Sequence, residues 1–124
     1  MVRMRSSARV IGVAAVLILA PFGTARAAGF DCAKASSQVE KLICADPELS
    51  RLDGELARDF ETIRRETSGI DGETGKPSFP FGRDQERWRM TVRDKCGDSA
   101  CLAEAYRTRL AQVRRDWKAI LTAQ

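Results

Sequence analysis

The sequence predicts an all-α protein: a small disulfide-stapled helical bundle with one short helix and three longer ones. Three observations predict it. Apolar residues recur at steps of three and four over most of residues 37–124, the period of amphipathic helices. Alternation with a period of two is missing beyond the N-terminal segment, so we expect no sheet. Four cysteines in a short chain with an export signal indicate disulfide bonds.

Residues 1–27 have the pattern of a secretory signal peptide. Three arginines precede ten apolar residues that begin at Val10, and small residues follow, with Ala25 and Ala27 at the positions that specify cleavage. The apolar run is about half of the ~20 residues that a membrane-spanning helix needs. We therefore expect a signal peptide at 1–27, one domain at 28–124, no membrane span after cleavage, and a periplasmic or secreted location.

The predicted domain is electrically neutral but asymmetric. The net charge of +4 comes from the four arginines of residues 1–27, and residues 28–124 hold 17 basic and 17 acidic side chains. This balance argues against a nucleic-acid-binding surface, which needs a basic patch. Residues 28–75 hold 11 acids and 6 bases, whereas residues 76–124 hold 6 and 11. Either the halves neutralise each other on folding, which we favour, or an acidic face remains for a basic partner.

The first two predicted helices have clear start signals. Ser37 and Glu40 form the pattern of a capping box at the start of the short helix SSQVEKLICA. The second helix is expected from about Asp46 to Glu66, with Asp46 as its cap and Pro47 at its first position. Its apolar stripe comprises Leu49, Leu52, Leu56, Phe60 and Ile63.

A glycine- and proline-rich stretch, SGIDGETGKPSFPFG, is expected to be a flexible connector to the second half. The third helix is predicted over RDQERWRMTVRDKC, and Gly97 ends it. The fourth helix is predicted to begin at Asp98 or Ser99 and to run to the C-terminus. Its apolar positions are Leu102, Tyr106, Leu110, Val113, Trp117 and Ile120.

The cysteines are interpreted as structural. The chain has no histidine, which excludes a mixed cysteine–histidine zinc site and a Cys–His or Ser–His catalytic pair. The spacings from Cys32 to Cys44 and from Cys96 to Cys101 match neither paired zinc knuckles nor a thioredoxin-like motif. Three disulfide pairings are possible, and we expect the two local ones, because a Cys96–Cys101 bond would fix the angle between the last two helices. We expect no metal and no cofactor.

Few residues are candidates for chemistry. No nucleophile motif or phosphate-binding glycine loop is present, so no catalytic residue is predicted. Asp53 borders the apolar stripe of the second helix, and we expect it to form an interhelical ion pair with Arg93 or Arg109. For contact with a basic partner, the candidates lie in the acid-rich first half: Asp46, Glu48, Asp71 and Glu73.

Two blocks of the chain, FDCAKASSQVEKLICADPELSRLDGELA and QERWRMTVRDKCGDSACLAEAYRTRL, resemble the LprI-like lysozyme inhibitor family over about residues 30–111. The matching positions of the first block are Cys32, Ala33, Glu40, Ile43, Cys44, Asp46, Leu49, Leu52 and Asp53. Those of the second are Gln85, Trp88, Arg93, Cys96, Cys101, Leu102, Tyr106, Arg109 and Leu110.

The resemblance implies a helical, disulfide-containing fold and an exported binding protein rather than an enzyme. The family is named for a lipoprotein that inhibits lysozyme, so the partner it implies is lysozyme or a related cell-wall hydrolase. This chain departs from that lipoprotein because it lacks a lipid-attachment box. The alternative is a structural or interaction module of the cell envelope with another protein partner and no catalytic activity.

Overall fold

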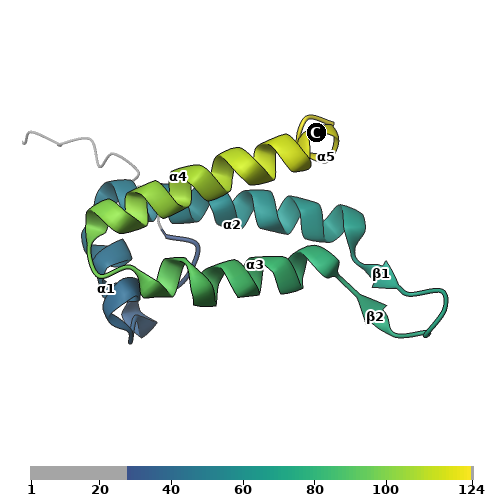
Figure 1. The fold of residues 1–124 in the computed structure, drawn as a ribbon, viewed down its shortest axis with the longest axis horizontal. Helices are drawn as coiled ribbons and strands as arrows, with labels where there is room; N and C mark the ends of the chain where they lie inside the picture. Colours follow the sequence, from purple (N-terminus) through teal and green to yellow (C-terminus); the bar gives the residue numbers. More distant parts are fainter. Residues whose placement is uncertain (1–27, 124) are drawn as a thin grey trace, which may run out of the picture.

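The computed structural model describes residues 28–123, and the predicted signal peptide at 1–27 lies outside them. The fold is a helical bundle in which the long helix α2 lies between α3 and α4 (Figure 1). The elements in chain order are the 3-10 helix η1 (Cys32–Lys34), α1 (Gln38–Ala45), α2 (Pro47–Thr67), β1 (Gly69–Ile70), β2 (Pro77–Ser78), α3 (Pro80–Thr91), the 3-10 helix η2 (Arg93–Lys95), α4 (Ser99–Asp116) and α5 (Lys118–Leu121). The predicted fold class is confirmed.

The starts of α1 and α2 confirm the predicted caps. The Ser37 hydroxyl accepts a hydrogen bond from the Glu40 amide at 3.1 Å, and the Glu40 carboxylate accepts one from the Ser37 amide at 3.1 Å. The Asp46 carboxylate accepts from the amides of Glu48 and Leu49, at 2.9 and 3.3 Å. These contacts satisfy amide groups that have no partner within a helix.

The expectation of no sheet is wrong for the connector. β1 and β2 pair antiparallel, with Gly69 opposite Ser78 and Ile70 opposite Pro77. In the loop between them, Gly75 has a φ of 65°, which glycine adopts without steric cost. Backbone hydrogen bonds hold β1 and β2 together, and neither strand has alternating apolar residues. The search for a two-residue apolar period therefore did not predict this hairpin. Residues 69–78 are called the hairpin below.

The third and fourth helices differ from the prediction at their ends. α3 begins at Pro80, because the fixed φ of proline suits a first helical position, and it ends at Thr91 before η2. α4 has the predicted Asp98 cap, whose carboxylate accepts from the Cys101 amide at 2.8 Å. The last helix is interrupted at Trp117, whose backbone leaves the helical range as its ring packs against Phe81 at 5.4 Å between centroids.

The hydrophobic core lies where the apolar stripes of α1, α2 and α4 meet, with Phe81 contributed by α3. Most predicted stripe positions are buried, whereas Phe60, Trp88 and Trp117 are half-buried against the core. The core members with the largest fully buried side chains are Tyr106, Ile43, Leu49, Ile63, Leu102 and Val113. No helix within residues 28–123 combines the length and apolarity that crossing a membrane requires.

The two ends of the bundle are closed differently. Disulfides join Cys32 to Cys44 and Cys96 to Cys101, as predicted. They lie at the end where α1 and the α3–α4 connection meet (Figure 1). The opposite end, from which the hairpin projects, is closed by an aromatic cluster whose neighbouring ring centroids lie 5.3–6.1 Å apart: Phe60, Phe79, Phe81 and Trp117.

Candidate functional site

The four acidic residues proposed for partner binding do not form one face. Asp46 caps the first turn of α2, whereas Asp71 lies in the hairpin beyond the last turn of the same helix. A helix of 21 residues is roughly 30 Å long, so the two pairs of candidates are at opposite ends of the molecule.

Glu48 is already paired within the fold. Its carboxylate accepts from the guanidinium of Arg51 at 2.7 and 2.8 Å and from that of Arg107 at 3.3 Å. These hydrogen bonds, that of Arg51 foremost, lower the pKa of Glu48 to about 2. A partner that recruited this carboxylate would have to compete with two arginines of the protein itself.

Asp71 and Glu73 differ from Glu48 because no cation of residues 28–123 pairs with them. One oxygen of Asp71 accepts from the Thr74 amide at 2.7 Å, the Thr74 hydroxyl at 2.8 Å and the Glu73 amide at 3.1 Å. These hydrogen bonds, led by that from the Thr74 amide, lower the pKa of Asp71. Neither carboxylate forms an ion pair with any residue of the described range 28–123. The hairpin therefore carries two negative charges that no ion pair of the described range neutralises, with Glu73 exposed and Asp71 half-buried, and one exposed positive charge at Lys76.

Part of the charge asymmetry between the two halves is neutralised between α2 and α4, by Arg107 and Arg114. Arg114 of α4 donates to Asp59 at 2.8 Å and to Glu55 at 3.0 Å, both on α2. Arg107 donates to Glu48, which lies in the first turn of α2. The structure thus favours the first interpretation, in which the halves neutralise each other on folding.

Asp53 forms a different contact from the one predicted. It is 9% exposed, and the Tyr106 hydroxyl donates to its Oδ1 at 2.6 Å while the Gly29 amide donates to its Oδ2 at 2.7 Å. The predicted ion pair with Arg93 or Arg109 is wrong: within the described part of the chain, Asp53 pairs with neither. The Tyr106 hydroxyl lies against both Asp53 and the Arg93 guanidinium, so it bridges the two charges.

The two buried arginines have other carboxylate partners. Arg93 donates through Nε to Asp94 at 2.8 Å. Arg109 donates to Asp84 at 2.7 Å and to Gln85 at 3.0 Å, and its guanidinium lies over the rings of Phe81 and Trp88 at 5.6 and 5.7 Å. Both arginines are therefore structural, as expected, although their partners lie on their own half of the chain.

Gly29 is a site residue that sequence reasoning missed. A Cβ atom at this position would collide with the Cβ of Ala57 and lie 3.2 Å from the Asp53 carboxylate. Only glycine lets the N-terminal arm, residues 28–30, come this close to α2. The sequence offered no signal for this, because a glycine beside an export signal looks like a linker.

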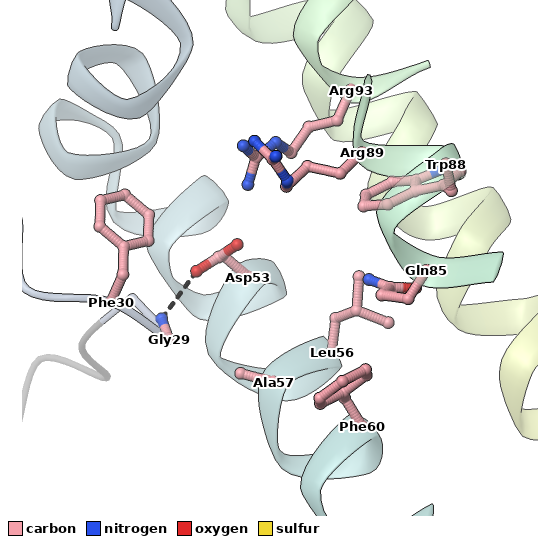
Figure 2. Close-up of a pocket in the computed structure, with 10 residues that line it drawn as sticks. All are labelled: Gly29, Phe30, Asp53, Leu56, Ala57, Phe60, Gln85, Trp88, Arg89 and Arg93. Atoms are coloured by element: carbon pink, nitrogen blue, oxygen red, sulfur yellow. Dashed lines mark hydrogen bonds between the residues drawn. The ribbon is translucent and has the colours of Figure 1, made fainter. Parts of the chain in front are cut away.

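A pocket of roughly 230 Å³ lies between the N-terminal arm, α2 and α3 (Figure 2). Its apolar walls are the rings of Phe30 and Phe60, the indole of Trp88, and the side chains of Leu56 and Ala57. Its polar lining comprises Asp53, Gln85, Arg89 and Arg93. Figure 2 shows the guanidinium groups of Arg89 and Arg93 extending from α3 and η2 toward the side of the pocket where Asp53 lies.

The Tyr106 hydroxyl acts as a hydrogen-bond donor beside this pocket. Burial, and next the neighbouring Asp53 charge, raise the pKa of Tyr106 far above its usual value, so its hydroxyl stays protonated and acts as a donor. Within residues 28–123, no three cysteine or carboxylate side chains gather as a metal site requires.

Comparisons of the chain with protein-family models, with curated proteins and with solved structures found no match.

Proposed function

We propose that this protein is an exported binding protein that inhibits lysozyme or a related cell-wall hydrolase, and that the hairpin is its contact element. The observation that carries the proposal is a contrast in charge pairing. Arginines of α4 neutralise three acids of α2, which are Glu48, Glu55 and Asp59. Asp71, which is half-buried, and Glu73, which is exposed, form no ion pair within residues 28–123. The hairpin also projects beyond the helices (Figure 1).

The hairpin is suited to insert into a partner without reordering. Its strands are paired, and the Asp71 carboxylate holds the turn through three hydrogen bonds. A pre-organised loop loses less conformational entropy on binding than a flexible one. Ile70, at the base of the turn, is 68% exposed and supplies an apolar contact beside the two charges.

Charge complementarity supports the choice of partner. Lysozymes of the animal type are strongly basic, and an acidic element on the binder accelerates encounter with a basic protein. The resemblance to the LprI-like lysozyme inhibitor family supports the same partner, and two disulfides suit an oxidising, extracytoplasmic compartment.

The test is inhibition of lysozyme-driven cell lysis by the disulfide-bonded protein, secreted from its full-length chain. We expect inhibition that weakens as salt rises. The double variant Asp71→Asn/Glu73→Gln should lower the association rate by roughly tenfold at low ionic strength. The control Glu104→Gln/Asp116→Asn removes the same charge from α4 and should change little.

Two outcomes would count against the proposal. Lysis that proceeds unchanged with an excess of protein would remove lysozyme as the partner. Recovery of envelope proteins without any hydrolase, in a pull-down from periplasmic extract, would favour the alternative of an envelope interaction module.

A further inference from the structure

The pocket beside Asp53 has no role in the proposed inhibition. It lies along the middle of α2, between Asp53 and Phe60, whereas the hairpin begins only after α2 ends at Thr67. A binding site here would be independent of the hairpin, and its polar groups indicate which ligand it would take.

The donors of the pocket exceed the acceptors around them. Arg93 is only 8% exposed, and of its five N–H groups one donates to Asp94 and the Tyr106 hydroxyl lies against the guanidinium. The remaining N–H groups of Arg93 meet no further carboxylate or carbonyl acceptor in residues 28–123, and the guanidinium extends toward the pocket (Figure 2). No fully buried side-chain nitrogen or oxygen atom in residues 28–123 lacks a hydrogen-bond partner, so the free N–H groups of Arg93 are those open to the pocket. There they favour a ligand that brings oxygen acceptors.

Asp53 supplies an acceptor next to Arg93, since the Tyr106 hydroxyl lies against both groups. Each of its carboxylate oxygens accepts one hydrogen bond, from Tyr106 or from Gly29, and each has a second lone pair. A ligand group that reaches both Asp53 and Arg93 from the pocket must therefore both donate and accept hydrogen bonds. A hydroxyl group does both, whereas a carboxylate or phosphate at neutral pH only accepts.

The local charge also argues against an anionic ligand. The guanidinium groups of Arg89 and Arg93 are balanced by Asp94 and by Glu86, which accepts from Arg89 at 2.5 and 2.9 Å. Asp53, together with Glu40, which is near both guanidinium groups, then leaves this side of the pocket with an excess of negative charge. A neutral ligand enters such a site without electrostatic cost.

The apolar walls and the volume of the pocket further restrict which ligand it can bind. The rings of Phe30, Phe60 and Trp88 line a volume of roughly 230 Å³, which is smaller than the ~300–1,000 Å³ of sites for larger ligands. Aromatic faces carry partial negative charge and attract polarised C–H groups. A pyranose ring has such C–H groups on its faces and hydroxyls at its edge.

We propose that this pocket binds one neutral sugar ring, with hydroxyl groups that contact Arg93 and Asp53 from the pocket side and a C–H face against the aromatic walls. The site takes a single ring rather than an oligosaccharide, because of its volume. With so few ligand atoms, the dissociation constant is on the order of 1 mM.

The test is an NMR titration of the full disulfide-bonded protein with glucose, N-acetylglucosamine, glucuronate and phenylacetate. We expect the two neutral sugars to shift amide resonances around Asp53 and Arg93 saturably, and the two carboxylates to bind at least several-fold more weakly. Phe30→Ala removes a half-buried wall outside the main core and should weaken sugar binding about tenfold. Phe30→Tyr should restore it, and Met90→Ala, at a position 50% exposed and outside the pocket, should have no effect.

Three results would overturn the proposal: no saturable shift with either neutral sugar, equal binding of the carboxylates, or sugar binding that Phe30→Ala leaves intact. The test of sugar binding can be distinguished from the test of lysozyme inhibition by the hairpin. Phe30→Ala should leave lysozyme inhibition unchanged, and Asp71→Asn/Glu73→Gln should leave the sugar-induced shifts unchanged, so either proposal can fail alone.

Discussion

The two ends of α2 are held by different kinds of interaction. At the end where it begins, Cys32–Cys44 joins η1 to α1 and Cys96–Cys101 joins η2 to α4, so short elements are fixed covalently. At the end where it stops, Phe60, Phe79 and Phe81 pack together with Trp117, and the hairpin projects from this cluster.

The comparison teaches where a small domain needs cross-links. An element of three to eight residues, such as η1 or α1, buries too little apolar surface to offset its loss of conformational entropy. A disulfide reduces that loss by restricting the unfolded chain. Aromatic rings bury much larger areas each, so the other end needs no covalent link.

The largest effect is expected from Phe81→Ala at the aromatic end. Phe81 is 4% exposed and contacts Phe60, Phe79, Trp117 and the Arg109 guanidinium. Its truncation leaves a cavity and should lower the free energy of unfolding by about 3–5 kcal/mol, measured by urea denaturation. Met90→Ala on the same helix, at an exposed position, is the control. If Phe81→Ala lowered the free energy of unfolding by less than removal of either disulfide does, the disulfide end would contribute more to stability than the aromatic end, contrary to this prediction.

A smaller effect is expected from removing each disulfide. In the chain-entropy model, Cys32→Ala/Cys44→Ala opens a loop of about thirteen residues and lowers the free energy of unfolding by ~3 kcal/mol. Cys96→Ala/Cys101→Ala opens a loop of about six residues and lowers it by ~2 kcal/mol. The same denaturation experiment, with the oxidised protein as reference, measures both. Equal losses for the two variants would show that loop length does not control stability at this end.

The smallest effect is expected from pH at the capping box of α1. Hydrogen bonds from the backbone amides of Ser36 and Ser37 lower the pKa of Glu40 to about 2, below its value of about 4.3 in an unfolded chain. Because the folded pKa is the lower one, the contribution of Glu40 is complete above about pH 4 and is lost as the pH falls toward 2.

Glu40→Gln keeps an acceptor but does not titrate, so the stability difference between wild type and variant should shrink from pH 5 to pH 2. Thermal melts across this range measure the difference. Glu104→Gln, which removes an exposed charge from α4, serves as the control. A wild-type curve parallel to that of Glu40→Gln would exclude a role for this carboxylate in acid unfolding.

The sequence by itself determined the helices, their caps and the disulfide framework, because these depend on residues within a few positions of one another. Ser37 with Glu40, Asp46 with Pro47, and the apolar stripes are local signals, and the short loops favoured the local cysteine pairs. The hairpin was missed because its two-residue strands are too short to show a period.

Only the tertiary structure decided the site. Asp53 and Tyr106 are 53 positions apart, and Gly29 reaches Asp53 from the other side, so no spacing in the sequence relates the three. Apolar periodicity correctly assigned Tyr106 to the core. A buried hydroxyl needs a hydrogen-bond partner, however, and which residue becomes that partner depends on how α2 and α4 pack. The same packing pairs Glu48, Glu55 and Asp59 of α2 with arginines of α4, whereas the acids of the hairpin form no ion pair within residues 28–123.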